Sequence, residues 1–216
     1  MDLIPDNDFG PLNHTLKASD EIPDNFRPDV TDNVADMKLS GGNGSGTNFR
    51  VIENNSAAIY GQELEYSCGA ACGRTLLRDE GISLPEADVR SALNKFSINS
   101  GVMADYLSQA MNKLASSNGI DRRFNGGFLM KEGIDQHFDT FMDMANSGRS
   151  FMSNLNGHWV VVDGFDASNA IVRMRDPWNN NIPLDSFRSL QFGRTVEMDR
   201  SAFINAWQRT NGGVVW

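Results

Sequence analysis

The most informative segment of the chain is residues 62–72, which read Gln-Glu-Leu-Glu-Tyr-Ser-Cys-Gly-Ala-Ala-Cys. Apolar residues at helical spacing predict a helix over 69–80, and Gly81 follows it as a stop signal. Cys68 is therefore expected where a loop enters a helix, which is an exposed and electropositive place. The unpaired N–H groups and the dipole of a helix start favour the thiolate, the nucleophilic form of cysteine. The segment predicts that Cys68 is reactive.

Three neighbours of Cys68 bear on this prediction. Gln62 lies six residues upstream, a spacing that suits a side-chain amide donating beside the Cys68 N–H into an oxyanion hole. Gly69 would let a substrate approach the start of the helix closely. Cys72 falls on the apolar stripe of the helix and is expected to be an ordinary buried thiol. Because a lone cysteine is more often such a buried residue, the assignment of Cys68 depends on finding a base.

The base is expected among three histidines. His14 lies in the N-terminal segment, and His137 lies within a predicted helix, where a structural or surface role is favoured. His158 begins the β-branched run His-Trp-Val-Val-Val-Asp-Gly-Phe directly after an Asn-Gly pair, so its ring can face a cleft. His158 is therefore the candidate base.

A carboxylate that orients this imidazole is expected at Asp176. A second β-branched run over 170–174 follows an Asp-Ala-Ser-Asn turn, so the two runs predict a hairpin. The end of the second strand returns beside the start of the first, where Asp176 can fix the tautomer of His158 and stabilise its imidazolium. Asp163 is interpreted as a turn residue before Gly164.

The order of the elements predicts an α+β domain, because helices come first and strands follow. Further helices are expected from Pro85 onward, over 103–114 and over 134–142, and a further strand over 195–198. A last helix, capped by Asp199 or Ser201, would carry Phe203 and Trp207 on one face.

The chain is expected to divide at about residue 56. Residues 1–56 hold ten acidic and four basic residues, four of the seven prolines and the Gly/Ser-rich run 40–46. Such a segment buries too little apolar surface to offset the entropy of ordering it. We expect residues 1–56 to form an acidic, flexible arm and residues 57–216 to form the folded domain.

The composition of the 216 residues excludes several classes of protein. The net charge of −9 argues against a nucleic-acid surface. No apolar run approaches the roughly 20 residues of a membrane helix, and the acidic N-terminus is unlike a signal peptide. Two cysteines cannot build a disulfide framework, and no Cys/His spacing suits zinc. We therefore expect a soluble protein with no nucleic acid, membrane, metal or cofactor among its partners.

Three motifs together resemble the papain-like peptidases that cut double-glycine leader peptides, known as domains of bacteriocin-exporting ABC transporters and as stand-alone relatives. The motifs are Gln62-x5-Cys68-Gly69, the run from His158 to Phe165, and Asp176-Pro-Trp; the closing segment from Ser201 to Trp207 is similar to the family's final Phe-x3-Trp. The resemblance covers about residues 57–210 and implies a papain-like fold, in which a helical half carrying the nucleophile packs on an antiparallel β-sheet half.

The same resemblance implies the role of each site residue. Cys68 would be the nucleophile, His158 the general base and acid, Asp176 the orienting carboxylate and Gln62 the oxyanion donor. The reaction would be endopeptidase cleavage after Gly-Gly. No membrane segment follows, so a role in exporting the protein's own peptide is not expected.

A stand-alone domain behind a flexible arm also resembles toxin modules that competing bacteria deliver to one another. This implies export by a contact-dependent or specialised secretion system, action in the recipient cytoplasm and a cognate immunity protein. The substrate would be a protein that presents Gly-Gly in an extended segment. Trp159, Trp178 and Phe165 are candidates to wall a narrow groove for it, and the alternative is that they are ordinary core aromatics.

The arm contains a candidate site for self-cleavage. Leu39-Ser-Gly-Gly-Asn43 has an aliphatic residue two positions before the glycine pair, so cleavage would follow Gly41-Gly42. A plain linker is the alternative interpretation of these residues.

Other functions share the same residues in the same order. Transglutaminases, glutamine deamidases and cell-wall peptidases also use a cysteine, a histidine and an aspartate, and differ in what attacks or leaves the acyl-enzyme. A non-catalytic module that binds leader-like segments is a second class of alternative, although such modules usually lose the nucleophile.

Overall fold

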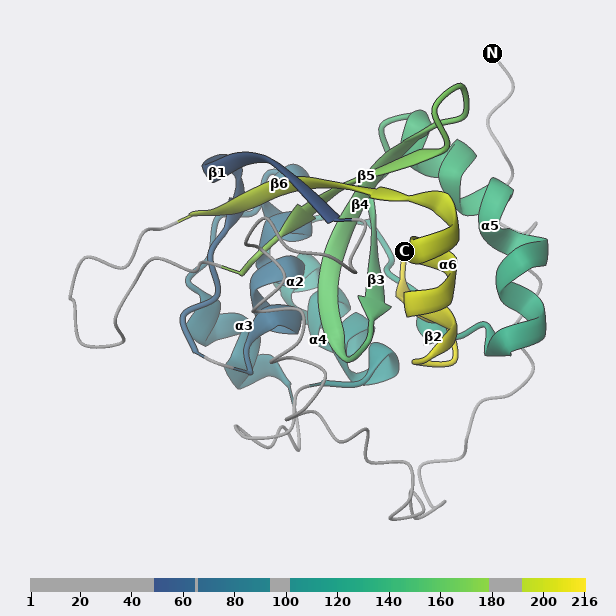
Figure 1. Ribbon diagram of the computed structural model, residues 1–216. Coiled ribbons are helices and arrows are strands. Elements are labelled where there is room, and N and C mark those ends of the chain that lie inside the picture. The colour runs from purple at the N-terminus through teal and green to yellow at the C-terminus, as the bar shows by residue number, and fades with distance from the viewer. Residues whose placement is uncertain (1–48, 65, 94–101, 179–191) are drawn as a thin grey trace.

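The computed structural model describes residues 49–64, 66–93, 102–178 and 192–216. Within these ranges, five helices pack on one seven-stranded antiparallel sheet with the strand order β1-β6-β5-β4-β3-β7-β2 (Figure 1). The elements in chain order are β1 (Phe49–Tyr60), α2 (Cys68–Asp79), α3 (Glu86–Ala92), α4 (Ala104–Ser117), β2 (Gly126–Phe128), α5 (Met130–Asn146), β3 (Phe151–Leu155), β4 (His158–Asp166), β5 (Ile171–Asp176), β6 (Phe192–Asp199), α6 (Arg200–Gln208) and β7 (Gly213–Val215).

The sheet separates two hydrophobic cores. Strand β4 shows how, because successive side chains of a strand point to opposite faces. Trp159 and Val161 join the core under α2, α3 and α4, whereas Val160 and Val162 join the core under α5 and α6. Figure 1 shows the two groups of helices on the two sides of the sheet. The α+β class expected from the element order is confirmed.

The folded region begins earlier than residue 57. Strand β1 starts at Phe49 and pairs with β6 along its length, with register shifts at three places. These irregularities break the alternation of apolar and polar residues by which a strand is recognised in a sequence. The remainder of the expected arm, residues 1–48, lies outside the described residues, as do Gly41 and Gly42.

Two smaller expectations differ from the structure. Asp163 is not a turn residue: it lies within β4 at a register shift between Val162 and Gly164, and such a bulge redirects a side chain. Asp199 occupies the N-cap position of α6, but its side chain makes no capping hydrogen bond.

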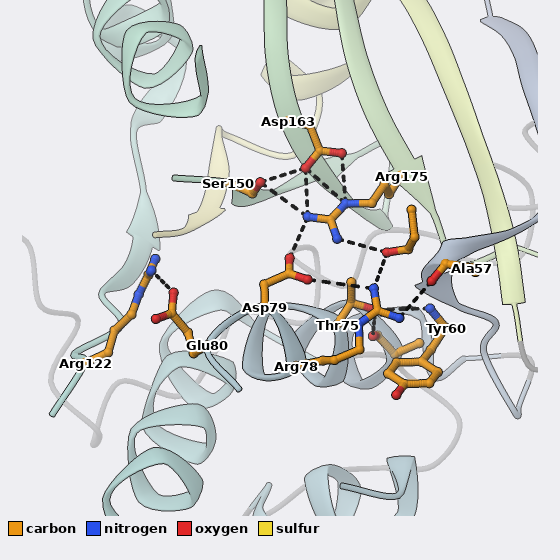
Figure 2. A network of polar contacts seen from close by, with 12 residues as sticks. Ala57, Tyr60, Thr75, Arg78, Asp79, Glu80, Arg122, Ser150, Asp163 and Arg175 are labelled. Carbon is orange, nitrogen blue, oxygen red and sulfur yellow. Dashed lines mark hydrogen bonds and ion pairs between the residues drawn. The ribbon is translucent and has the colours of Figure 1, made fainter. Parts of the chain in front are cut away.

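A buried arginine joins the sheet to α2 (Figure 2). Arg175 of β5 donates to both carboxylate oxygens of Asp163 at 2.8–3.0 Å, to Asp79 at the end of α2 at 2.7 Å, and to the carbonyl oxygen of Ala58 in β1 at 2.9 Å. Because Arg175 directly precedes Asp176, this network fixes the strand that carries Asp176 against the helix that begins at Cys68.

Arg175→Met should lower the free energy of unfolding by about 2–4 kcal/mol, because it leaves Asp79 and Asp163 without their shared cation. Urea denaturation measures this change. Arg173→Met is the matched control on the same strand: the Arg173 side chain is 60% exposed and should cost less than about 0.5 kcal/mol. Equal effects of the two substitutions would contradict a special role for Arg175.

Candidate active site

Cys68 is the first residue of α2, with Ser67 at the N-cap position. The residue is only 7% exposed, which differs from the exposed position expected from the sequence. The difference arises because α2 packs on β4, a contact that no local pattern reveals. The N–H groups of the first helical turn have no intrahelical acceptor, so they remain available to stabilise negative charge.

His158 is placed by a tight turn. Asn156 and Gly157, with φ of 53° and 85°, form the two-residue loop between β3 and β4, and Leu155 pairs with His158 across it. Positive φ at both loop residues is the type I′ geometry that Asn-Gly pairs favour. The buried ring places Nε2 at 2.7 Å from Asp176 Oδ1, which leaves Nδ1 for the hydrogen bond with Cys68.

Asp176 is buried and fully engaged. Its Oδ1 also accepts the backbone N–H of Trp178 at 2.9 Å, and its Oδ2 accepts two guanidinium nitrogens of Arg194, each at 2.8 Å. Burial raises the pKa of Asp176, but His158, Arg194 and the Trp178 N–H lower it below its usual 3.8. The side chain is therefore a carboxylate that bridges an imidazole and a guanidinium.

The electrostatics favour charge separation between sulfur and imidazole. Burial raises the pKa of the Cys68 thiol, but the hydrogen bond and the charge of His158 lower it, with help from backbone N–H groups, to below its usual 9.0. Burial lowers the pKa of His158, but the charge and hydrogen bond of Asp176, with those of Cys68, raise it to about 10. Both shifts favour the thiolate–imidazolium form of the pair, whose two groups titrate together.

Comparison with known proteins supports the fold. No protein-family model matches the chain, and no curated protein sequence matches it. Among solved structures, the peptidase domain of Streptococcus ComA, a bi-functional ABC transporter involved in quorum sensing, is 17% identical with a TM-score of 0.50, covering 73% of this chain and 95% of that one. A protein from Bacillus anthracis described as a C39-like peptidase is 14% identical with a TM-score of 0.50, covering 77% and 96%.

The chain has the papain-like cysteine peptidase fold. A third structure, a double glycine motif protease from an AMS/PCAT transporter in complex with its leader peptide, is 16% identical with a TM-score of 0.49, covering 77% of this chain and 95% of that one. At such identities the likeness concerns the fold, so the chemistry of this chain is argued from its own residues.

Within this papain-like fold, Gln62 lies on the loop that leads into α2. Its backbone N–H donates to the carbonyl oxygen of Pro177 at 2.9 Å, which joins the loop to the residue after Asp176. Its side-chain amide donates to the carbonyl oxygen of Leu64 at 2.8 Å.

Gly69 is accounted for by packing. A Cβ at this position would lie 2.4 Å from Val102 Cγ1 and 3.0 Å from Trp159 Cδ1. The indole of Trp159, which is 2% exposed, donates to the carbonyl oxygen of Val102 at 2.9 Å. The space above Gly69 is therefore filled by protein, and Trp159 takes the core position that the sequence left as an alternative.

The other aromatic candidates lie apart from one another. Trp178 is half-buried and adjoins Asp176 through its backbone. Phe165 packs edge-on against Phe138, with ring centroids 5.3 Å apart, and contacts the core under α5 and α6 rather than the core that contains Cys68. Of these two residues, only Trp178 adjoins the site.

Cys72 is buried one helical turn after Cys68. Its thiol donates to the carbonyl oxygen of Trp159 at 3.3 Å, and burial, with the negative charge of Cys68, raises its pKa well above 9.0. Cys72 therefore stays a neutral thiol. In the part of the chain that the structure describes, no three His, Cys, Asp or Glu side chains gather to hold a metal, and no helix is long and apolar enough to cross a membrane.

Two residues near the site were not found from the sequence. Arg194 stands opposite Asp176 in the pairing of β5 with β6, and Glu86 is a buried acid at the start of α3. Both positions are set by contacts between elements far apart in the chain, and neither residue belongs to a recognisable motif.

Proposed function

We propose that this protein is a cysteine peptidase that hydrolyses peptide bonds in a protein substrate. The observation that carries the proposal is the buried chain of Cys68, His158 and Asp176, whose charges favour a thiolate at the start of α2. The papain-like fold supports the same function. A thiolate beside an imidazolium supplies both the nucleophile and the proton that cleavage of an amide needs.

The reaction proceeds in two halves. The Sγ of Cys68 attacks the carbonyl carbon of the scissile bond, and the N–H of Cys68 and the amide of Gln62 stabilise the resulting oxyanion. The His158 imidazolium gives its Nδ1 proton to the leaving amine, which departs and leaves an acyl-enzyme. Neutral His158 then takes a proton from water, the hydroxide attacks the thioester, and the carboxylic acid product leaves as Cys68 regains its charge.

Mass spectrometry of a bacterial lysate treated with the protein tests this function. New protein N-termini that are missing after treatment with Cys68→Ala would support the peptidase. A mass increase of about one dalton at glutamine, without chain cleavage, would instead support a glutamine deamidase, and cross-linking would support a transglutaminase. No chemical change of any kind would favour the leader-binding module.

For specificity, we propose cleavage after Gly-Gly, on the basis of the motif resemblance. Peptides with Gly-Gly, Gly-Ala and Ala-Ala before the scissile bond distinguish this from broad cleavage, and each alanine should lower kcat/KM by about 100-fold or more in a groove that excludes a β-carbon. The protein's own Gly41-Gly42 is the proposed self-cleavage site. N-terminal sequencing of incubated wild-type protein should then begin at Asn43, whereas Cys68→Ala stays intact.

We also propose an effector role in bacterial competition, which the resemblance to delivered toxin modules supports. Expression of the protein in a bacterial cytoplasm should stop growth, and expression of Cys68→Ala should not. A cognate immunity protein would restore growth by binding the protein. Normal growth with active protein in the cell would contradict the effector role and leave the peptidase function standing.

Asp176→Asn should retain a small residual activity, with kcat lower by about 10²–10⁴-fold. The nucleophile and base remain, but the amide no longer stabilises the imidazolium, and Arg194 loses its buried counterion. Steady-state kinetics with a cleavable peptide measures the loss. Wild-type kcat in a folded Asp176→Asn protein would contradict the role given to Asp176.

A further inference from the structure

Glu86 is a buried acid with no part in the mechanism above. It is the first residue of α3, and its side chain is 0% exposed. Burying a carboxyl group costs stability unless its polar atoms are satisfied, which makes a buried acid beside a site a candidate for a specific role.

The contacts of Glu86 lie at both ends of one short loop. Its Oε2 accepts the backbone N–H of Glu63 at 3.0 Å, and its carboxyl group forms a hydrogen bond with the hydroxyl of Ser67. Glu63 directly follows Gln62, and Ser67 directly precedes Cys68. The carboxyl group therefore contacts the two residues that adjoin the proposed oxyanion donors, through the backbone at Glu63 and through the side chain at Ser67.

Hydrogen bonds continue from these contacts to the Gln62 amide. The N–H of Leu64 donates to Ser67 Oγ at 2.9 Å, and the Ser67 hydroxyl lies 3.0 Å from the carbonyl oxygen of Leu64. That same carbonyl accepts the side-chain amide of Gln62 at 2.8 Å. A displacement at Glu86 would thus be passed through Ser67 and Leu64 to Gln62.

The charges around Glu86 do not satisfy it fully. Arg90 Nε lies 3.7 Å from Oε1, which has no hydrogen-bond partner, and Arg90 also donates to the half-exposed carboxylate of Glu63 at 3.1 Å. Burial raises the pKa of Glu86 to about 7; hydrogen bonds from Ser67 and the Glu63 N–H lower it, the Glu63 charge raises it and Arg90 lowers it. The negative charge of Glu86 also raises the pKa of the buried Cys72 thiol.

We propose that Glu86 is a positioning residue for the oxyanion hole, holding the loop between Gln62 and Cys68 so that both donors point at one oxygen. The proposal rests on the peptidase function proposed above. It assigns Glu86 no contact with the substrate: the residue acts through Glu63 and Ser67.

Kinetics and thiol alkylation with three variants test the proposal. Glu86→Leu should lower kcat for a cleavable peptide by about 10- to 100-fold, as expected for a misplaced oxyanion donor, with KM within about twofold. The rate at which iodoacetamide alkylates Cys68 should stay within about twofold, because the thiolate does not need the oxyanion hole.

Glu86→Gln should restore kcat to within about threefold of wild type, since an amide oxygen also accepts the Glu63 N–H. Asp88→Asn, at an exposed position of the same helix, is the matched control and should match wild type.

Two further measurements cover the case in which Glu86→Leu does not fold. Ser67→Ala, which removes little volume, should lower kcat several-fold without changing the alkylation rate. At pH 8, Glu86→Gln should melt about 3 °C or more above wild type, and this difference should shrink as the pH falls through about 7 and vanish below about 4.5, the usual pKa of this carboxyl group. The sign follows because the raised pKa favours protonated Glu86 in the fold, so wild type loses stability as the pH rises through about 7.

The outcomes separate the two proposals. Wild-type protein that cleaves no peptide would overturn the proposed function. Active wild type with unchanged kcat in Glu86→Leu or, where that variant does not fold, in Ser67→Ala would overturn the positioning role alone. Equal losses of kcat and of Cys68 alkylation would also overturn it, since they would show a site that has collapsed rather than a misplaced loop.

Discussion

Replacing Cys68 with alanine should lower kcat/KM for peptide cleavage by about 10⁵-fold or more. No other group in the site can form the acyl-enzyme: Cys72 is a neutral thiol held on the Trp159 carbonyl, and its raised pKa leaves almost no thiolate near pH 7. The fold should survive, because alanine is a good residue for a helix start and the His158–Asp176 bond does not involve Cys68. Peptide kinetics and thermal melting measure the two effects.

Cys72→Ala is the matched control for this result. It removes the same group one helical turn later, in a fully buried position, and should keep activity within a few-fold of wild type. The opposite outcome, an active Cys68→Ala and an inactive Cys72→Ala, would show that Cys72 rather than Cys68 is the nucleophile. Loss of folding in Cys68→Ala would show that the thiolate and imidazolium hold the two halves of the domain together.

The three central residues could be predicted from the sequence because each is placed by a local rule. A helix start places Cys68, an Asn-Gly turn places His158, and hairpin pairing returns Asp176 to the beginning of β4. Short-range signals of this kind can be recognised in a sequence without knowledge of the tertiary contacts. Their meeting point could be predicted because papain-like proteins place these three signals in the same order.

What the sequence did not reveal depends on long-range contacts. Strand β1 is irregular and has a polar run, residues 53–56, in its middle, and it is a strand because β6 lies beside it. The burial of Cys68 and the packing above Gly69 follow from the contact of α2 with β4. The sequence around Arg194 indicates an ordinary surface charge. The register of β6 against β5 is what brings Arg194 into contact with Asp176.

Replacing His158 with alanine should lower kcat/KM by about 10⁴-fold or more and should also slow the alkylation of Cys68. Without the imidazolium, burial dominates the environment of Cys68 and moves its pKa back to its usual 9.0 or above. At pH 7 that leaves about 1% thiolate or less, so iodoacetamide should react more slowly than with wild type, whose lowered pKa keeps more of the thiol ionised. His137→Ala, on α5, makes the same substitution away from the site and should change neither rate.

The pH dependence of these two rates separates the two roles of His158. In wild type the lowered pKa of Cys68 should bring the rise of the alkylation rate to a lower pH than in His158→Ala. In His158→Ala it should rise about tenfold per pH unit between pH 7 and 9, as an isolated buried thiol ionises. Hydrolysis should not recover over the same range, because the leaving amine still lacks its proton donor. Recovery of hydrolysis at pH 9 would mean that the His158 imidazole serves only to ionise the sulfur of Cys68. Equal alkylation rates of both proteins at pH 7 would mean that His158 does not lower the pKa of Cys68.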